Sequence, residues 1–269
     1  VYDEFCPANL CKYLIQTSRK GLKTAVFLKP CDTYGVNQLL KDNRIQRELV
    51  YAVGTPCSGM LDIKKIKAAG AKAIVKVETE GDKVVVTTAL GEVTLNKADV
   101  LLDKCIMCKG NEYKIADEEL GEKLLTPEFT GDKVAGVKAI EAMGDKERFA
   151  FWQQELSKCI RCNACRDICP ACTCEPRIFA HPQSPVAGKA YADPVEEQLF
   201  HIIRAYHVAG RCVGCGECGR VCPQGVKLGL LNMKFMKDIN TFFGPYQAGA
   251  DATTPAPQVD YKLDDSEVD

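Results

Sequence analysis

The chain has 269 residues, with 35 Lys or Arg against 36 Asp or Glu, so its formal net charge is −1. This balance lacks the basic excess of a nucleic-acid-binding protein, and no apolar run approaches the roughly 18 residues that a transmembrane helix needs. The length suits one large domain or two modest ones. The opening segment VYDEFCPANL has neither a charged leader nor an apolar signal core, so we expect a cytoplasmic protein.

Cysteine is the decisive feature of the composition, with 16 residues. Disulfides are typical of small secreted domains with poor cores, whereas this chain is long and shows no export signal. Most of its cysteines also follow one another at short intervals, which favours metal ligation. The sequence therefore predicts a metal protein.

Residues 1–115 are expected to form an α/β domain with a largely parallel sheet. Apolar runs, helical periodicity and Gly stops define its elements. In chain order we expect a helix over 8–20, a strand over 24–31, a crossover helix over 34–46, a strand over 48–57, a helix over 60–69, a hairpin of 71–78 with 83–89, and a last apolar run over 98–105 that would be another parallel strand.

The remainder of the chain is expected to be mainly helical. Residues 116–150 are a charged connector with one or two short helices, and residues 151–245 form a cysteine-rich domain. Within that domain residues 194–209 predict a helix whose apolar positions recur at helical spacing. These positions are Val195, Leu199, Ile202, Ile203 and Tyr206. Residues 246–269 are acidic and rich in Pro and Thr, so we expect a disordered tail.

Two cysteine runs in this domain share the pattern C-x2-C-x2-C-x3-C-P. This is the ligand run of 4Fe–4S ferredoxins, in which the fourth Cys of each run ligates the other cluster. We expect one cluster on Cys159, Cys162, Cys165 and Cys222, and a second on Cys212, Cys215, Cys218 and Cys169. The alternative is a pair of zinc sites, but zinc ligands usually come as two CxxC pairs.

A third thiol set is expected at the edge of the N-terminal sheet. Cys31 and Cys57 follow two consecutive strands, and the carboxyl ends of parallel strands meet at one edge. Cys105 and Cys108 follow the last apolar run. Four converging thiols are the ligand count of a third 4Fe–4S cluster. The alternatives are a zinc site or unligated buried thiols.

Four cysteines remain, namely Cys6, Cys11, Cys172 and Cys174. They would allow a fourth metal site; otherwise they are packing thiols, with Cys11 beside Leu14 and Ile15.

Other polar residues carry weaker signals. His181, His201 and His207 are isolated, and we expect the last two to pack or hydrogen-bond rather than bind metal. Arg161 and Arg166 lie near the cysteine loops, where they either tune a cluster or face solvent. No G-x-G-x-x-G fingerprint follows a strand.

The segment Asp32-Thr33-Gly35 opens a helix directly after a strand. It would hold a phosphate or a flavin there, or Asp32 simply caps the helix.

The segments KPCDTYGV, VGTPCSGM and CIMC resemble the beta-subunit family of formate dehydrogenases and deazaflavin-reducing hydrogenases. CIRCNACRDICPACTC and HVAGRCVGCGECGRVCP resemble the helical two-cluster ferredoxin modules of succinate dehydrogenase-type and heterodisulfide reductase-type subunits. The resemblance covers most of residues 1–245 and implies electron transfer between a partner oxidoreductase and a carrier. Many family members bind a flavin. The module order differs from that of the hydrogenase subunits, in which the ferredoxin motifs come first.

The sequence thus predicts an iron–sulfur electron-transfer subunit of an anaerobic multi-subunit oxidoreductase, which relays single electrons through three clusters. The resemblance implies partner subunits of the hydrogenase, formate dehydrogenase or heterodisulfide reductase type. No acid–base or nucleophile–base pair stands out in the sequence, so we expect the substrate chemistry on a partner. The alternative is a beta subunit with FAD that itself oxidises or reduces a nicotinamide or deazaflavin.

Overall fold

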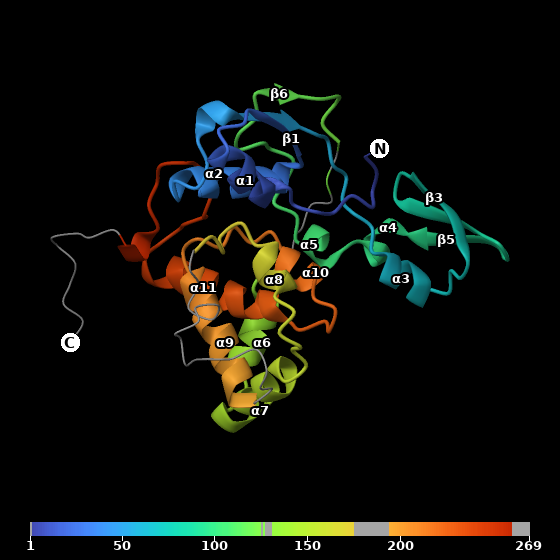
Figure 1. The fold of residues 1–269 in the computed structure, drawn as a ribbon. Helices are drawn as coiled ribbons and strands as arrows, with labels where there is room; N and C mark the ends of the chain where they lie inside the picture. Colours follow the sequence, from blue (N-terminus) through green and yellow to red (C-terminus); the bar gives the residue numbers. More distant parts are fainter. Residues whose placement is uncertain (1, 125, 127–130, 175–193, 260–269) are drawn as a thin grey trace.

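The computed structural model describes residues 2–124, 126, 131–174 and 194–259. Three parts surround the middle of the molecule (Figure 1). They are an N-terminal part built on a parallel sheet, a small lobe built on an antiparallel sheet, and a helical part. The described portion therefore combines a parallel sheet with a helical region, as expected, although the N-terminal region contains two sheets instead of one.

The parallel sheet contains β1 (Thr24–Leu28), β2 (Val50–Gly54) and β6 (Glu118–Glu119), in the order β1-β2-β6. Thr24 pairs with Val50 and Leu28 with Gly54. The crossover between β1 and β2 runs through α2 (Pro30–Lys41), and η1 (Cys11–Tyr13), α1 (Leu14–Arg19) and η2 (Arg47–Leu49) complete this part. Apolar residues of these elements form one core, and both predicted strands are confirmed in shorter form.

Helix α2 begins four residues earlier than the sequence suggested. Pro30 occupies its first turn, where a missing N–H costs nothing. Lys29 and Asp32 form a capping arrangement and an ion pair of 2.7 Å, both nearly fully buried. As a result Cys31 lies in the first turn of a helix rather than at the end of a strand.

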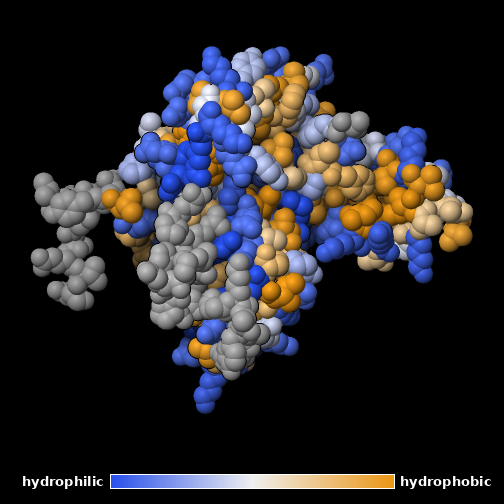
Figure 2. All heavy atoms as spheres, in the orientation of Figure 1, coloured by the Kyte–Doolittle hydropathy of each residue, from blue (hydrophilic) through white to orange (hydrophobic). Residues whose placement is uncertain are grey.

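The small lobe contains α3 (Ile63–Ala68), β3 (Ile74–Glu80), β4 (Lys83–Thr88) and β5 (Gly91–Asn96). Its sheet is antiparallel in the order β3-β4-β5, which confirms the predicted hairpin and adds a third strand. Val84 and Val86 of the central strand are buried against Ile66 of α3. Figure 2 shows apolar residues gathered over this lobe, where Val75 and Leu90 are 72% and 84% exposed.

The expected parallel strand over 98–105 is wrong. Asn96 caps α4 (Lys97–Val100) by accepting the Ala98 N–H, and α5 (Asp103–Ile106) follows after a single antiparallel bridge from Leu101 to Leu61. Because β5 pairs with β4 in the small lobe, the chain leaves that sheet far from β1 and β2. The third strand of the parallel sheet is instead β6.

The helical part contains α6 (Ala135–Glu141), α7 (Asp145–Leu156), α8 (Ala164–Asp167), α9 (Pro194–His207), α10 (Glu217–Arg220) and α11 (Leu228–Phe242). The predicted helix over 194–209 is therefore confirmed as α9, and two short helices lie in or next to the connector. In the described ranges no helix is long and apolar enough to cross a membrane.

Helix α9 turns its polar side inward. Val195 and Tyr206 of the predicted apolar stripe are 67% and 63% exposed, whereas His201 and Arg204 are 1% and 5% exposed. Glu197 shares this buried face. The hydrophobic pattern identified the helix but gave the wrong buried side, because the inner face of α9 is mixed: Phe200 and Ala205 are buried on it next to Glu197, His201 and Arg204.

Part of the segment expected to be a disordered tail packs against α2. The Asn37 amide donates to Gly249 O at 3.2 Å, and the Tyr246 hydroxyl donates to Gly210 O at 3.0 Å. The short turn η4 (Pro257–Val259) ends the described chain. Residues 246–259 thus tie the helical part to the N-terminal part, while residues 260–269 lie outside the described residues.

We expect Gly249→Ala to lower the free energy of unfolding by more than about 1 kcal/mol beyond the loss caused by Gly244→Ala. Both glycines have positive φ, but only at Gly249 would a Cβ overlap the backbone of Tyr34. Urea unfolding of both variants measures the difference. Equal midpoints would show that the packing of this segment on α2 contributes nothing.

Candidate metal centres

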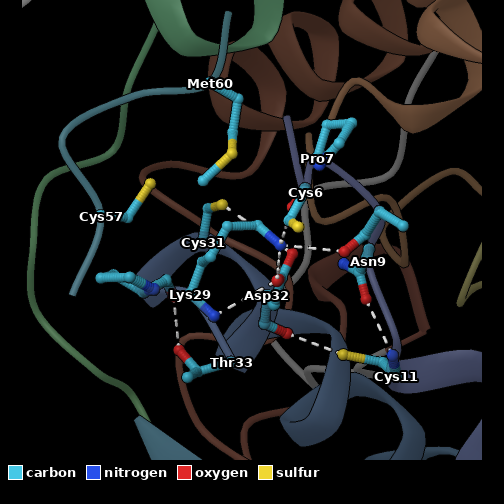
Figure 3. A network of polar contacts seen from close by, with 12 residues as sticks. Cys6, Pro7, Asn9, Cys11, Lys29, Cys31, Asp32, Thr33, Cys57 and Met60 are labelled. Atoms are coloured by element: carbon cyan, nitrogen blue, oxygen red, sulfur yellow. Dashed lines mark hydrogen bonds and ion pairs between the residues drawn. The ribbon is translucent and has the colours of Figure 1, made fainter. Parts of the chain in front are cut away.

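The strand-edge thiols line one cavity next to the carboxyl ends of β1 and β2. Cys31, Cys57, Cys105 and Cys108 all contribute to its wall. Figure 3 shows the side chains of Cys31, Cys57 and Met60 pointing toward the same space beside the start of α2. The structure thus brings the four predicted residues together, although Cys105 arrives on α5 and not on a strand.

Backbone N–H groups already point at three of these sulfur atoms. Gly59 N lies 3.4 Å from Cys57 Sγ, Met60 N lies 3.3 Å from Cys105 Sγ, and Gly110 N lies 3.4 Å from Cys108 Sγ. Amide donors of this kind stabilise a thiolate over a thiol. Four thiols around one cavity, with donors behind them, fit a 4Fe–4S cluster. The same thiols would also bind zinc, and metal analysis distinguishes the two.

Burial opposes ionisation at this site, and buried cations offset it. Desolvation raises the pKa of Cys31 well above its usual range, while Lys104 and Lys29 act in the opposite direction. Burial likewise raises the pKa of Cys57 and Cys105, each of which a backbone N–H lowers in part. Burial thus disfavours free thiolates here, and a positively charged occupant such as a metal centre would favour them.

The first ferredoxin motif forms a second thiol-lined cavity. Cys159, Cys162 and Cys165 line it together with Cys222, which belongs to the other motif. This is the crossed set expected of a two-cluster ferredoxin. The geometry accommodates the predicted assignment, and ligation itself stays a prediction.

Cysteines of the second ferredoxin motif lie near Cys169, the last cysteine of the first motif. A hydrogen bond with Cys172 and then burial raise the pKa of Cys169 most, and the neighbouring Cys215 and Cys212 raise it further. Cys218 lies close enough to Cys212 for the two to disfavour each other's charge, after the larger effect of burial. The second predicted set thus also comes together, with Cys172 beside it.

The two motif loops share one backbone conformation. Arg161 and Gly214 have φ of 52° and 65°, and Asn163 and Gly216 have φ of 62° and 68°. At the first loop this turn aims Arg161 N at Cys159 Sγ, 3.4 Å away. The second loop uses glycine, and a Cβ at Gly216 would overlap the side chain of Lys104. Repeated local geometry at equivalent positions therefore accompanies the repeated cysteine spacing.

A buried ion pair joins the strand-edge site to the second motif. Lys104 of α5 pairs with Glu217 of α10, and their side chains are 7% and 0% exposed. Glu217 also accepts from Arg220 at 2.7 Å, and Lys104 donates to Pro7 O at 2.6 Å. Gly214 and Cys215 of the second loop line the strand-edge cavity as well. The two sites are therefore immediate neighbours.

Several of these cations have no marker in the sequence. Lys109 donates to Val213 O and to Gln247 Oε1, the latter at 3.0 Å, and burial lowers its pKa to about 8. Lys104 and Glu217 are ordinary charged residues in the sequence, and only the packing of α5 on α10 reveals them.

That polar face of α9 lies beside the first motif. Glu197 accepts from Arg161 Nε at 2.6 Å, so Arg161 does not face solvent. Arg204 lies 3.9 Å from Cys172 Sγ through its Nη1. Burial opposes its charge, yet Cys165 and Cys172 hold its pKa above the usual range.

The remaining cysteines differ in role. Cys11 packs with Leu14 and Ile15 in the core, as predicted, and its thiol donates to Asp32 O at 2.9 Å. Cys6 Sγ lies 3.4 Å from Asp3 Oδ1. Cys172 and Cys174 follow the first motif, whereas His181 lies outside the described residues.

The start of α2 is closed by its own contacts. Asp32 caps the helix and pairs with Lys29, and Thr33 Oγ1 donates to Pro30 O at 2.6 Å. A Cβ at Gly35 would lie 3.0 Å from Cys11 Sγ, so protein fills that side. The capping interpretation explains Asp32, while Lys29, Pro30 and Cys31 at the start of α2 line the strand-edge cavity.

Comparisons with known proteins agree with this geometry. Residues 155–226 match the family described as 4Fe-4S dicluster domain. The chain is 25% identical to the F420-dependent formate dehydrogenase subunit beta of Methanocaldococcus jannaschii, over 93% of this chain and 79% of that protein. It is 24% identical to the F420-dependent formate dehydrogenase 1 subunit beta of Methanococcus maripaludis, over 76% and 67%.

A shorter match covers only the cysteine-rich region. Ferredoxin-3 of Rhodobacter capsulatus is 34% identical over 24% of this chain and 66% of its own length. Together these similarities confirm the resemblance to formate dehydrogenase beta subunits and the presence of a dicluster iron–sulfur region.

We expect Cys57→Ser to lower the iron content by about four atoms per chain and to leave the two ferredoxin sites loaded. Serine removes one of four thiols from the strand-edge cavity and touches neither motif. Iron and acid-labile sulfide analysis of anaerobically purified protein measures this. Cys11→Ser is the matched control, because the buried Cys11 thiol only donates a hydrogen bond to a backbone oxygen. The iron content of this variant should equal that of the parent protein. Unchanged iron in Cys57→Ser would contradict the strand-edge site.

Proposed function

We propose that this chain is an iron–sulfur electron-transfer subunit that relays single electrons through three 4Fe–4S clusters between partner subunits. The observation that carries the proposal is the shared wall of two sites. The strand-edge cavity is lined both by its own four cysteines and by Gly214 and Cys215 of the second motif. The proposed relay therefore has the second-motif thiols in the middle, with the strand-edge thiols on one side and the first-motif thiols on the other.

The proposed ligands follow from the cavities. The strand-edge set is Cys31, Cys57, Cys105 and Cys108. The first-motif set is Cys159, Cys162, Cys165 and Cys222. The second-motif set is Cys212, Cys215, Cys218 and Cys169, supported by the mutual effect of these thiols on one another's pKa.

When bound, a 4Fe–4S cluster supplies one-electron redox chemistry over a wide range of potentials. The chain's residues hold the thiols, exclude water and balance charge. Lys109 and Arg204 bring buried positive charge to the sites, whereas Lys29 and Lys104 lie beside the strand-edge thiols as members of buried ion pairs with Asp32 and Glu217. Amide N–H groups and buried cations at the sulfur atoms favour the reduced, more negative state.

The relatives suggest the setting of this relay. Both long matches are beta subunits of formate dehydrogenases, and the proposed partners are accordingly other subunits of such a complex, in an anaerobic, cytoplasmic setting. The resemblance to subunits whose names state F420 dependence favours a second candidate, a flavin-bearing subunit that itself exchanges electrons with a deazaflavin or nicotinamide. A flavin is the group that would convert two-electron to one-electron transfer.

We expect anaerobic reductive titration of the purified chain to consume about three electrons, matching about twelve iron atoms and no flavin. Dithionite serves as the titrant, and cofactor released on denaturation is assayed for flavin. If one flavin per chain is released and about two further electrons are consumed, the second candidate, the flavin-bearing subunit, would be favoured over the relay. Zinc in place of iron would refute both.

A further inference from the structure

His201 is a buried imidazole whose ring nitrogens have no hydrogen-bond partner among the described residues. It lies on the inner face of α9 and is 1% exposed. Neither Nδ1 nor Nε2 has a hydrogen-bond partner in the described part of the chain. Leaving a buried polar group unsatisfied is unfavourable. The imidazole is therefore a candidate hydrogen-bond donor to a group held in the space in front of it.

The space in front of His201 is the first-motif cavity. His201 lines that cavity together with Cys159, Cys162, Cys165 and Cys222. A ring nitrogen of His201, Cys159 Sγ and a carboxylate oxygen of Glu197 all lie within 4.8 Å of one another. Glu197 Oε1 accepts from Arg161 at 2.6 Å, while Glu197 Oε2 is buried without a hydrogen-bond partner in the described part of the chain. Glu197 does not line the cavity, however, so the acceptor within the cavity itself is the sulfur of whatever the four thiols hold.

The imidazole is suited to donate rather than to ligate. An imidazole carries at least one N–H in either protonation state, so His201 can donate a hydrogen bond into the cavity that it lines. The cavity already offers four thiols, which complete the ligand set of a cubane.

The second motif has a side-chain donor of the same kind. Asn232, buried on α11, donates through Nδ2 to Cys218 Sγ at 3.6 Å. Each ferredoxin site thus has one buried polar side chain from a long helix directed at its sulfur atoms, Asn232 on one side and His201 on the other.

We infer that His201 donates an N–H···S hydrogen bond to the cluster of the first motif and thereby raises its reduction potential. This inference rests on the proposed iron–sulfur function. An N–H donor stabilises the extra negative charge that reduction places on the cluster sulfur atoms, and hydrogen bonds to sulfur are a principal determinant of cluster potential. His201 is a tuning residue and not a ligand, so the iron should stay when it is changed.

Potentiometric titration followed by EPR tests the inference on the full chain. In His201→Leu we expect unchanged iron content and a negative shift of one cluster's midpoint potential, the cluster whose signal Cys162→Ser alters. In His201→Gln, which retains an N–H donor, the shift should be smaller. His207→Leu is the matched control, because His207 lies on the same helix but is exposed, and it should leave every potential in place.

A second readout keeps the test decisive if a variant loads poorly. In protein with 15N-labelled histidine, pulsed EPR of the reduced chain should detect a weak nitrogen coupling that disappears in His201→Gln and persists in His207→Leu. Potentials that do not move, together with no histidine coupling, would overturn the inference while the iron content still supports the relay. Absence of iron in the parent chain would instead refute the proposed function.

Discussion

The structure depends on one electrostatic constraint: many thiols, each of which must be ionised to bind metal, are gathered inside a protein of modest size. An unpaired buried charge costs several kcal/mol, so such a site needs compensating partners close by. Burial raises the pKa of most of these cysteines. Around them the chain places four buried basic side chains: Lys109 and Arg204, and also Lys29 and Lys104, which in addition pair with Asp32 and Glu217.

These cations also explain how the parts of the molecule are joined. The contact between α5 and α10 is the Lys104–Glu217 pair, and Lys109 reaches Val213 from the other side of the same cavity. The residues that balance the thiols are thus also those that connect the N-terminal part to the helical part. The same two contacts therefore also set the position of the strand-edge site relative to the second motif.

The same constraint accounts for the unusual face of α9. In a helix that packs on an apolar core, the apolar stripe points inward. Here Glu197, His201 and Arg204 point inward because their neighbours are thiols and charged groups, and the apolar residues Val195, Leu199, Ile202 and Tyr206 are left at the surface. A pattern of hydrophobicity alone carries no information about which kind of interior a helix will meet.

The sequence by itself predicted the metal class and the two crossed ferredoxin sets, and it determined the parallel pair β1 and β2 and the convergence of Cys31 and Cys57. These follow from local spacing and from the rule that parallel strands end at one edge. Tertiary structure alone decided that Cys105 comes from α5 and not from a strand, that residues 246–259 return to α2, and that Lys104, Glu217 and His201 serve the sites. The physical reason is that spacing along the chain encodes ligand loops and periodic elements, whereas charge compensation and burial depend on contacts between segments far apart in sequence.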